Sequence, residues 1–133
     1  MSSSLPLTPD DIRSTLATDR LGRHLRLYQT LTSTNSEAMS LAQNGAEDGT
    51  VVAAESQSAG RGRHARTWFS PPGLNLYCSI IVRSLGQGLS LADWLSWVPL
   101  TAALAVAEAV HTVAATSLAL KWPNDLLLDE RKV

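Results

Sequence analysis

The sequence has few cysteines and no marked excess of charge of either sign. Its 133 residues include one cysteine, 11 Lys or Arg and 12 Asp or Glu, which gives a formal net charge of -1. A lone cysteine excludes an internal disulfide framework and favours a reducing cytoplasm. Cys78 lies within an apolar run, residues 76–82, where we expect a buried structural thiol. The balanced charge gives no chain-wide field for nucleic acid or an anionic membrane, so a basic site must be local.

The sequence also lacks a long uninterrupted apolar run. The longest apolar stretch, residues 95–107, is broken by Ser96, Pro99 and Thr101. A helix that spans a bilayer needs about 20 apolar residues, so we expect a buried helix here and no membrane association. Residues 1–4 (MSSS) show no basic segment before an apolar core, so we expect no secretory signal.

Helical and extended patterns alternate along the chain and predict a mixed α/β fold. We expect one helix with Thr8 as N-cap and Pro9 at its first position, and a second that begins with a capping box at Thr34 and Glu37. A long helix is expected over residues 91–114. The expected strands are residues 25–28, 50–54, 75–82, 118–120 and 126–128. This order predicts a central mixed β-sheet with helices packed on it.

The most informative segment is residues 60–68 (GRGRHARTW), part of an expected loop over residues 57–68. It has no hydrophobic periodicity, which predicts a mobile loop. Glycines allow close approach of the backbone to a ligand, and arginines present donor forks suited to phosphate or carboxylate oxygens. Trp68 offers a flat face on which a base can stack. The segment lacks a Walker A Gly-Lys-Ser/Thr, and a solvated basic loop or a nucleic-acid patch remains an alternative.

Three further polar groups lie at expected strand ends or in loops: residues 33–35 (STN), 121–125 (KWPND) and 131–132 (RK). Each alone has a structural explanation as a helix cap, a turn or a surface charge. Their order is more specific. The motifs S-T-N, Q-x-x-G-R-G-R-x-x-R-x-W, G-x-N-L-Y and K-W-P-N-D together resemble the catalytic domain of biotin protein ligases, over roughly residues 25–133.

This resemblance implies an incomplete class II aminoacyl-tRNA synthetase-like fold, the biotin/lipoate ligase fold. It implies ATP-dependent conversion of biotin to biotinyl-5'-adenylate with Mg²⁺, in the cytoplasm. Biotin is then transferred to a lysine of the biotin carboxyl carrier domain of a biotin-dependent carboxylase. The implied partners include neither DNA nor a membrane, and a homodimer is compatible with the resemblance.

The resemblance also assigns roles to individual residues. Arg63 and Lys132 are the implied catalytic residues. The implied biotin-binding residues are Ser33, Thr34, Asn35, Gln57, Arg61, Gly62, Arg63 and Lys132. The implied ATP-binding residues are Arg63, Arg66, Trp68 and Asn124. Asp125 is the implied metal ligand, through the hard oxygen that Mg²⁺ prefers.

Two departures from the family pattern accompany the match. His64 stands in the loop where many relatives have a basic residue. We also expect residues 1–133 to be the N-terminal part of a catalytic domain, without the helix-turn-helix and the C-terminal β-barrel of some members. The alternatives are a lipoate or octanoyl ligase-type acyltransferase of the same fold, an inactive ligase fragment, or a nucleic-acid-binding module.

Overall fold

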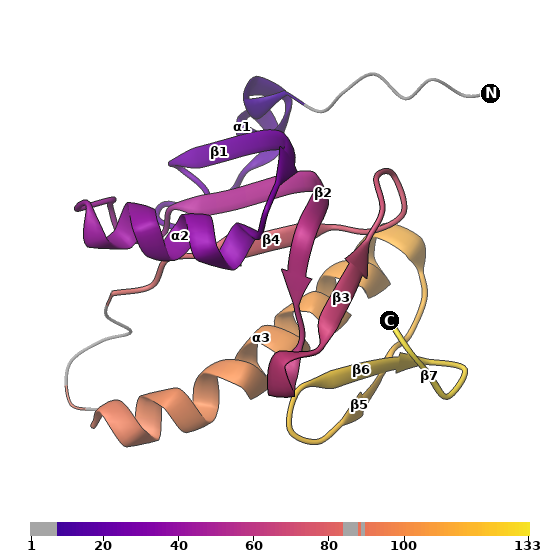
Figure 1. Cartoon of the computed structure of the whole chain (residues 1–133). Helices are drawn as coiled ribbons and strands as arrows, with labels where there is room; N and C mark the ends of the chain where they lie inside the picture. The colour runs from indigo at the N-terminus through magenta and orange to yellow at the C-terminus, as the bar shows by residue number, and fades with distance from the viewer. Residues whose placement is uncertain (1–7, 84–87, 89) are drawn as a thin grey trace. The chain divides into compact units, whose positions relative to one another are not determined.

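The computed structural model describes residues 8–83, 88 and 90–133, in two compact units, Met1–Ser84 and Leu85–Val133. Residues 1–4, where we expect no secretory signal, lie outside the described range. The helices and strands of the first unit, labelled in Figure 1, are α1 (Pro9–Thr15), β1 (Leu25–Leu31), α2 (Thr34–Gln43), β2 (Val51–Arg61), β3 (Thr67–Ser70) and β4 (Tyr77–Ile80). A 3-10 turn (Arg63–Ala65) lies between β2 and β3.

The long strand β2 organises the sheet of the first unit. One edge of β2 pairs in parallel with β1, from Leu25 opposite Val51 to Leu31 opposite Gln57. Its other edge pairs antiparallel first with β4 and then with β3, in which Gln57 lies opposite Ser70. The predicted mixed sheet is therefore confirmed, but β2 runs seven residues beyond the expected strand and includes the first part of the expected loop.

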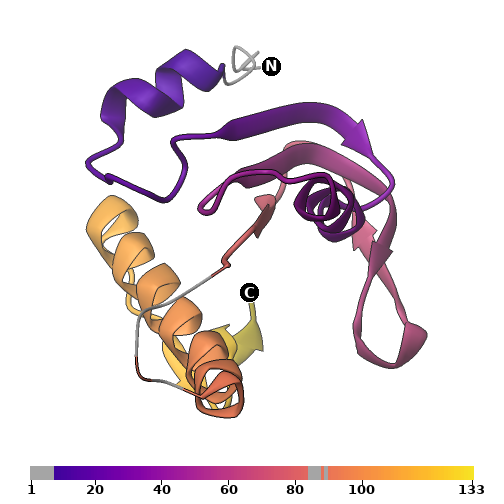
Figure 2. The same cartoon turned by 90° about the vertical axis from the view of Figure 1, so that its left-hand side faces the viewer.

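Helix α2 covers one face of this sheet (Figures 1 and 2). The core between them is formed by Ala38 of α2, the fully buried Val52 of β2 and Ile81, which follows β4. Tyr28 of β1 packs against this core, and its hydroxyl donates to Glu37 Oε1 at 2.9 Å. These contacts fix the start of α2 beside the carboxyl end of β1.

The two predicted helix starts have different outcomes. The first is confirmed, because Thr8 is the N-cap of α1, and the structure adds a capping box in which Thr8 exchanges hydrogen bonds with Asp11. The second is wrong, since the N-cap of α2 is Ser33, whose hydroxyl accepts from Ser36 N. Thr34 is the first residue of the helix, and its side chain bonds to other elements of the unit.

The second unit contains α3 (Leu91–Ala114) and an antiparallel sheet of β5 (Ala119–Lys121), β6 (Asp125–Leu128) and β7 (Arg131–Lys132). The bounds expected for α3 are confirmed. Strand β7 was not predicted, because it depends on a tight turn in which Asp129 and Glu130 have φ values of 48° and 63°. Sequence patterns rarely reveal two successive residues in this conformation when neither is glycine.

The expected burial of α3 is not observed. Ala103 is its one buried residue in the described part of the chain, since the short strands β5 and β6 offer little surface to cover it. The helix is longer than the apolar stretch seen in the sequence, at 24 residues with a mean hydropathy of 1.4 over its most apolar window. By length and composition alone it would therefore suffice to cross a membrane, a property that core helices share.

Candidate ligand-binding site

The Arg/Gly segment forms a β-hairpin. Gly60 and Arg61 of β2 pair with Trp68 and Thr67 of β3, so the expected mobile loop shrinks to a turn over residues 62–66. The backbone N–H of Gly62 donates to the carbonyl of Arg66 at 2.7 Å and closes this turn. The prediction of a long loop was wrong because most side chains of the hairpin are exposed, so its strands show no hydrophobic alternation to read.

Beside the hairpin turn lies an open hollow of about 620 Å³. Its lining residues are Ser58, Ala59, Gly60, Arg61, Gly62, Ala65, Arg66 and Thr67. Arg61 and Arg66 are exposed there, so the hollow carries positive charge. Its volume falls within the range of small-molecule sites, about 300–1,000 Å³. The hollow therefore suits an anionic ligand of nucleotide size.

The turn holds two successive residues in the left-handed conformation. His64 has φ 58° and Ala65 has φ 57°. Such turns orient neighbouring backbone N–H groups in similar directions, which favours binding of anions. Trp68 follows on β3 with 48% of its surface exposed, so part of its ring is accessible to a ligand.

The S-T-N motif and Gln57 meet through side-chain hydrogen bonds. The backbone N–H of Thr34 donates to Gln57 Oε1 at 2.8 Å, and the Thr34 hydroxyl donates to the same oxygen at 3.2 Å. Both groups come together because Leu31, just before α2, pairs with Gln57 on β2. Ser33 and Thr34 are buried, whereas Asn35 is exposed in the first turn of α2.

Two serines that the sequence analysis missed complete this network. Ser79 of β4 donates to Thr34 Oγ1 at 3.0 Å, and Gln57 Nε2 donates to Ser70 Oγ of β3 at 3.0 Å. Ser70 in turn donates to the carbonyl of Trp68 at 3.2 Å. The available signal was a serine at an inward-facing strand position, which is too frequent to single out.

The remaining predicted residues belong to the second unit. Lys132 Nζ of β7 forms an ion pair with Asp125 Oδ1 of β6 at 2.7 Å. Asn124 is exposed in the turn before β6. The predicted site residues thus form two groups: residues 33–68 in the first unit, and Asn124, Asp125 and Lys132 in the second.

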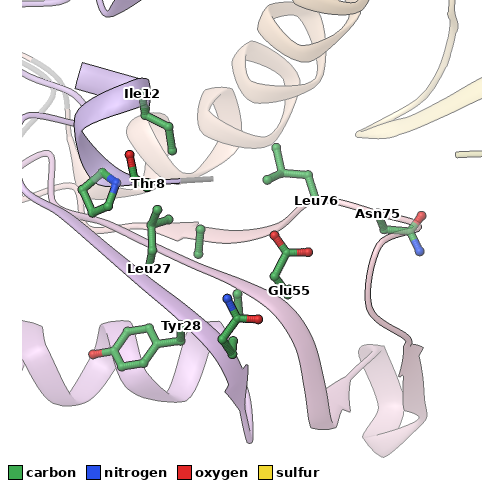
Figure 3. A pocket seen from close by; sticks show the side chains of 11 residues that line it. Thr8, Ile12, Leu27, Tyr28, Glu55, Asn75 and Leu76 are labelled. Atoms are coloured by element: carbon green, nitrogen blue, oxygen red, sulfur yellow. The ribbon is translucent and has the colours of Figure 1, made fainter. Parts of the chain in front are cut away.

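A further pocket of about 320 Å³ lies against the sheet of the first unit, beside α1 (Figure 3). Ile12, Leu27 and Leu76 make it mainly apolar, with the Glu55 carboxylate at its side. Tyr28, the neighbour of Leu27 on β1, points away toward α2. Its lining residues are not among the predicted site residues.

Cys78 differs from the expectation of a buried thiol. The residue is exposed on β4, while neighbouring atoms desolvate its sulfur and raise the pKa of the thiol. A raised pKa reduces the thiolate fraction and disfavours a nucleophilic role.

The chain belongs to the biotin/lipoate A/B protein ligase family, whose family model matches residues 27–133. It is 38% identical over 126 residues to the bifunctional ligase/repressor BirA of Bacillus subtilis (strain 168), a match that covers 95% of this chain and 38% of that protein. The resemblance seen in the motifs is therefore confirmed.

Solved structures of the family share the fold. The biotin protein ligase from Aquifex aeolicus in complex with biotin and ATP matches with a TM-score of 0.68 and 31% identity, over 84% of this chain and 44% of that one. The biotin protein ligase from Leishmania major in complex with biotinyl-5-AMP matches with a TM-score of 0.67 and 32% identity, over 84% of this chain and 49% of that one. The chain thus spans less than half the length of these relatives.

Proposed function

We propose that this chain carries the biotin- and ATP-binding part of a biotin protein ligase. The reaction is activation of biotin to biotinyl-5'-adenylate, followed by transfer to a lysine of a biotin carboxyl carrier domain. The observation that supports this most is the Thr34–Gln57 network, which adjoins an arginine-bearing hairpin. The network suits a neutral polar head group, and the hairpin suits an anionic nucleotide. The family match and neighbours that hold biotin and ATP add support.

The Thr34–Gln57 network suits the ureido ring of biotin, which is neutral and has both donors and acceptors. Hydroxyl and amide side chains bind such a ring without burying an unpaired charge. Ser33, Thr34, Asn35 and Gln57 are the residues proposed for this contact, with Arg61 and Gly62 of the hairpin beside them. The nearly complete burial of Ser33 and Thr34 keeps water away from these bonds.

The hairpin and the second unit supply the groups proposed for activation. A biotin carboxylate oxygen attacks the α-phosphorus of ATP, the bond to pyrophosphate breaks, and pyrophosphate leaves. This step brings two anions together, so positive side chains lower its barrier. We assign that role to Arg63 and Lys132, with Arg66 on the remaining phosphates. Trp68 would stack on adenine and Asn124 would bond to its edge.

Magnesium is the metal implied for this reaction. No cluster of three or more His, Cys, Asp or Glu side chains suited to a metal occurs in the described residues. Mg²⁺ in nucleotide sites takes only one or two carboxylates besides the substrate phosphates, so a single carboxylate is sufficient. Asp125 fits that role chemically, and Lys132 balances its charge in the structure at hand. The ion would supply further neutralisation of phosphate charge.

The second step needs no nucleophile from this chain. The amine of the acceptor lysine attacks the acyl carbon of biotinyl-5'-adenylate, AMP leaves, and an amide forms with loss of a proton. The raised pKa of the Cys78 thiol agrees with this scheme. The contribution of the chain is positioning and charge neutralisation. A cytoplasmic location would fit its single cysteine.

Exchange of labelled pyrophosphate into ATP tests the proposal directly. Biotin should support exchange in the presence of Mg²⁺, and lipoate and octanoate should not. Preference for lipoate or octanoate would show that the substrate is one of these acids, as in a lipoate or octanoyl ligase-type acyltransferase of the same fold, and not biotin. Absence of exchange with all three acids, despite binding of biotin, would indicate an inactive ligase fragment.

A further inference from the structure

The hydrogen bonds around Gln57 form one directional chain. Ser79 donates to Thr34, Thr34 donates to Gln57, Gln57 donates to Ser70, and Ser70 donates to the Trp68 carbonyl. The four distances lie between 3.0 and 3.2 Å. The hydroxyls of Thr34 and Ser70 each donate one bond and accept another, so adjacent bonds polarise one another.

The direction of this chain of hydrogen bonds is set by a backbone group. The N–H of Thr34 is only a donor, and it lies 2.8 Å from Gln57 Oε1. Gln57 must therefore turn its oxygen to Thr34 and its nitrogen to Ser70, whichever way an amide is first assigned. Ser70 is 5% exposed, so its hydroxyl is shielded from competing water.

The hairpin leaves room for the Gln57–Ser70 bond at Gly60. A Cβ at position 60 would lie 2.7 Å from Ser70 Oγ and 3.1 Å from Gln57 Nε2. It would also lie 2.7 Å from the carbonyl oxygen of Trp68, which is the last acceptor in the chain of hydrogen bonds. A side chain at position 60 would therefore crowd both partners of the Gln57–Ser70 bond.

We infer that Ser70 is a positioning residue for biotin recognition, an inference that rests on the proposed function. Ser70 acts through Gln57: it holds the amide nitrogen, and the backbone of β3 holds Ser70. Without the hydroxyl, the Gln57 side chain loses the partner that fixes its rotamer and amide orientation. Biotin then meets a mobile amide, and ordering it at each binding event lowers affinity.

A double-mutant cycle on biotin binding, measured by calorimetry on the whole chain, tests this role. Ser70→Ala should weaken binding about 2- to 12-fold, the range for loss of one hydrogen bond to a neutral partner. The double variant with Gln57→Ala should bind biotin as Gln57→Ala alone does, because Ser70 is inferred to act on biotin through Gln57. Ser40→Ala, on the exposed part of α2, serves as the matched control and should bind as the unchanged chain does.

A second readout requires no ligand. The side-chain NH₂ signals of Gln57 in ¹H–¹⁵N NMR spectra should shift and exchange faster with water in Ser70→Ala. Unmoved signals, or losses of affinity that multiply in the double variant, would overturn the inference. If the unchanged chain binds no biotin while the Gln57 signals still respond to Ser70→Ala, the proposed function fails and the positioning of Gln57 by Ser70 stands.

Discussion

Gly60 is the glycine of the Arg/Gly segment that has the least room for a side chain. A Cβ there would approach Trp68 O and Ser70 Oγ to 2.7 Å, whereas at Gly62 the nearest atom would be 3.4 Å away. Gly60→Ala should therefore lower the free energy of unfolding by about 1–3 kcal/mol, as overpacking does. Gly62→Ala is the matched control in the same hairpin. Thermal unfolding followed by circular dichroism checks this, and equal melting temperatures for the two variants would contradict it.

Asp48 makes the stability of the first unit depend on pH. The hydrogen bond from Arg20, followed by that from the backbone N–H of Arg83 at 2.7 Å, lowers the pKa of Asp48 from 3.8 to about 2. A lowered folded-state pKa stabilises the fold above the unfolded pKa, and this contribution is lost as the pH falls from about 4 to about 2.

Asp48→Asn should accordingly destabilise the chain at pH 7 but not at pH 2. The measurement is the difference in melting temperature between the variant and the unchanged chain, recorded from pH 7 down to pH 2. Asp10→Asn removes an exposed carboxylate from a 3.5 Å ion pair of α1 and should change little at any pH. A difference for Asp48→Asn that stays constant over this range would contradict the assignment.

Residue types in the motifs were predictable, but their partners were not. The motifs predicted Thr34 and Gln57 as site residues, and in the structure the Thr34 backbone N–H donates to Gln57 Oε1 at 2.8 Å. The motifs did not identify Ser70 or Ser79, because the value of these serines arises from pairings across the sheet between residues 13 and 45 positions apart. The helix cap was misplaced by one residue, because the spacing of Thr34 and Glu37 suggests a capping box. In the structure the Glu37 carboxylate accepts from the Tyr28 hydroxyl instead, and Ser33 is the N-cap.

At the scale of elements, Arg83 holds the C-terminal end of α2. Its Nη2 donates to the carbonyls of Ala42 and Ala46, each at 2.7 Å, and its Nε donates to Ala46 O at 3.0 Å. Lysine has no planar fork to reproduce this pattern. Arg83→Lys should lower the free energy of unfolding by about 1 kcal/mol, a modest value because the side chain is exposed.

Hydrogen exchange of the amides at the end of α2 measures this effect, because local unfolding there should become more frequent. Arg13→Lys on α1, whose ion pair with Asp10 is exposed, is the control. Unchanged exchange in Arg83→Lys would show that the end of α2 does not depend on the bonds from the guanidinium to the carbonyls of Ala42 and Ala46.

The hairpin itself should respond to ligands. Trypsin should cleave after Arg63 and Arg66, which lie outside the paired strands, faster than after Arg61, which pairs with Thr67. Biotin with ATP should slow cleavage at the turn if it closes on them, as lids do. Peptide mapping by mass spectrometry distinguishes the three sites. Equal rates with and without ligands would argue against closure.

Regular elements were predictable from periodicity, and the hairpin was not. The bounds of α3 agree with the sequence because a 24-residue apolar pattern with Ser90 as N-cap leaves little ambiguity. Strand β2, in contrast, continues through polar and glycine residues up to Arg61. Its extension is imposed by pairing with β3, which is a tertiary property that local propensity does not contain.

At the scale of the whole molecule, charge separates the proposed function from nucleic-acid binding. The formal net charge of -1 leaves the arginines of the hairpin as a local feature. A single-stranded oligonucleotide should therefore bind weakly, without the steep salt dependence that release of many counterions produces. Fluorescence anisotropy between 50 and 200 mM salt checks this. A loss of affinity of 10³-fold or more over that range would favour a nucleic-acid-binding module.

The left-handed turn has a consequence for how this hairpin can evolve. His64 and Ala65 hold φ values near 58° without the freedom of glycine, which costs roughly 1–2 kcal/mol for each residue. Substitution of either residue by glycine or asparagine should therefore be tolerated during evolution, whereas β-branched residues are disfavoured. Gly60 faces the opposite constraint, since its neighbours leave no space for a side chain. Within one hairpin, two positions are open to change by relief of strain and one is closed by packing.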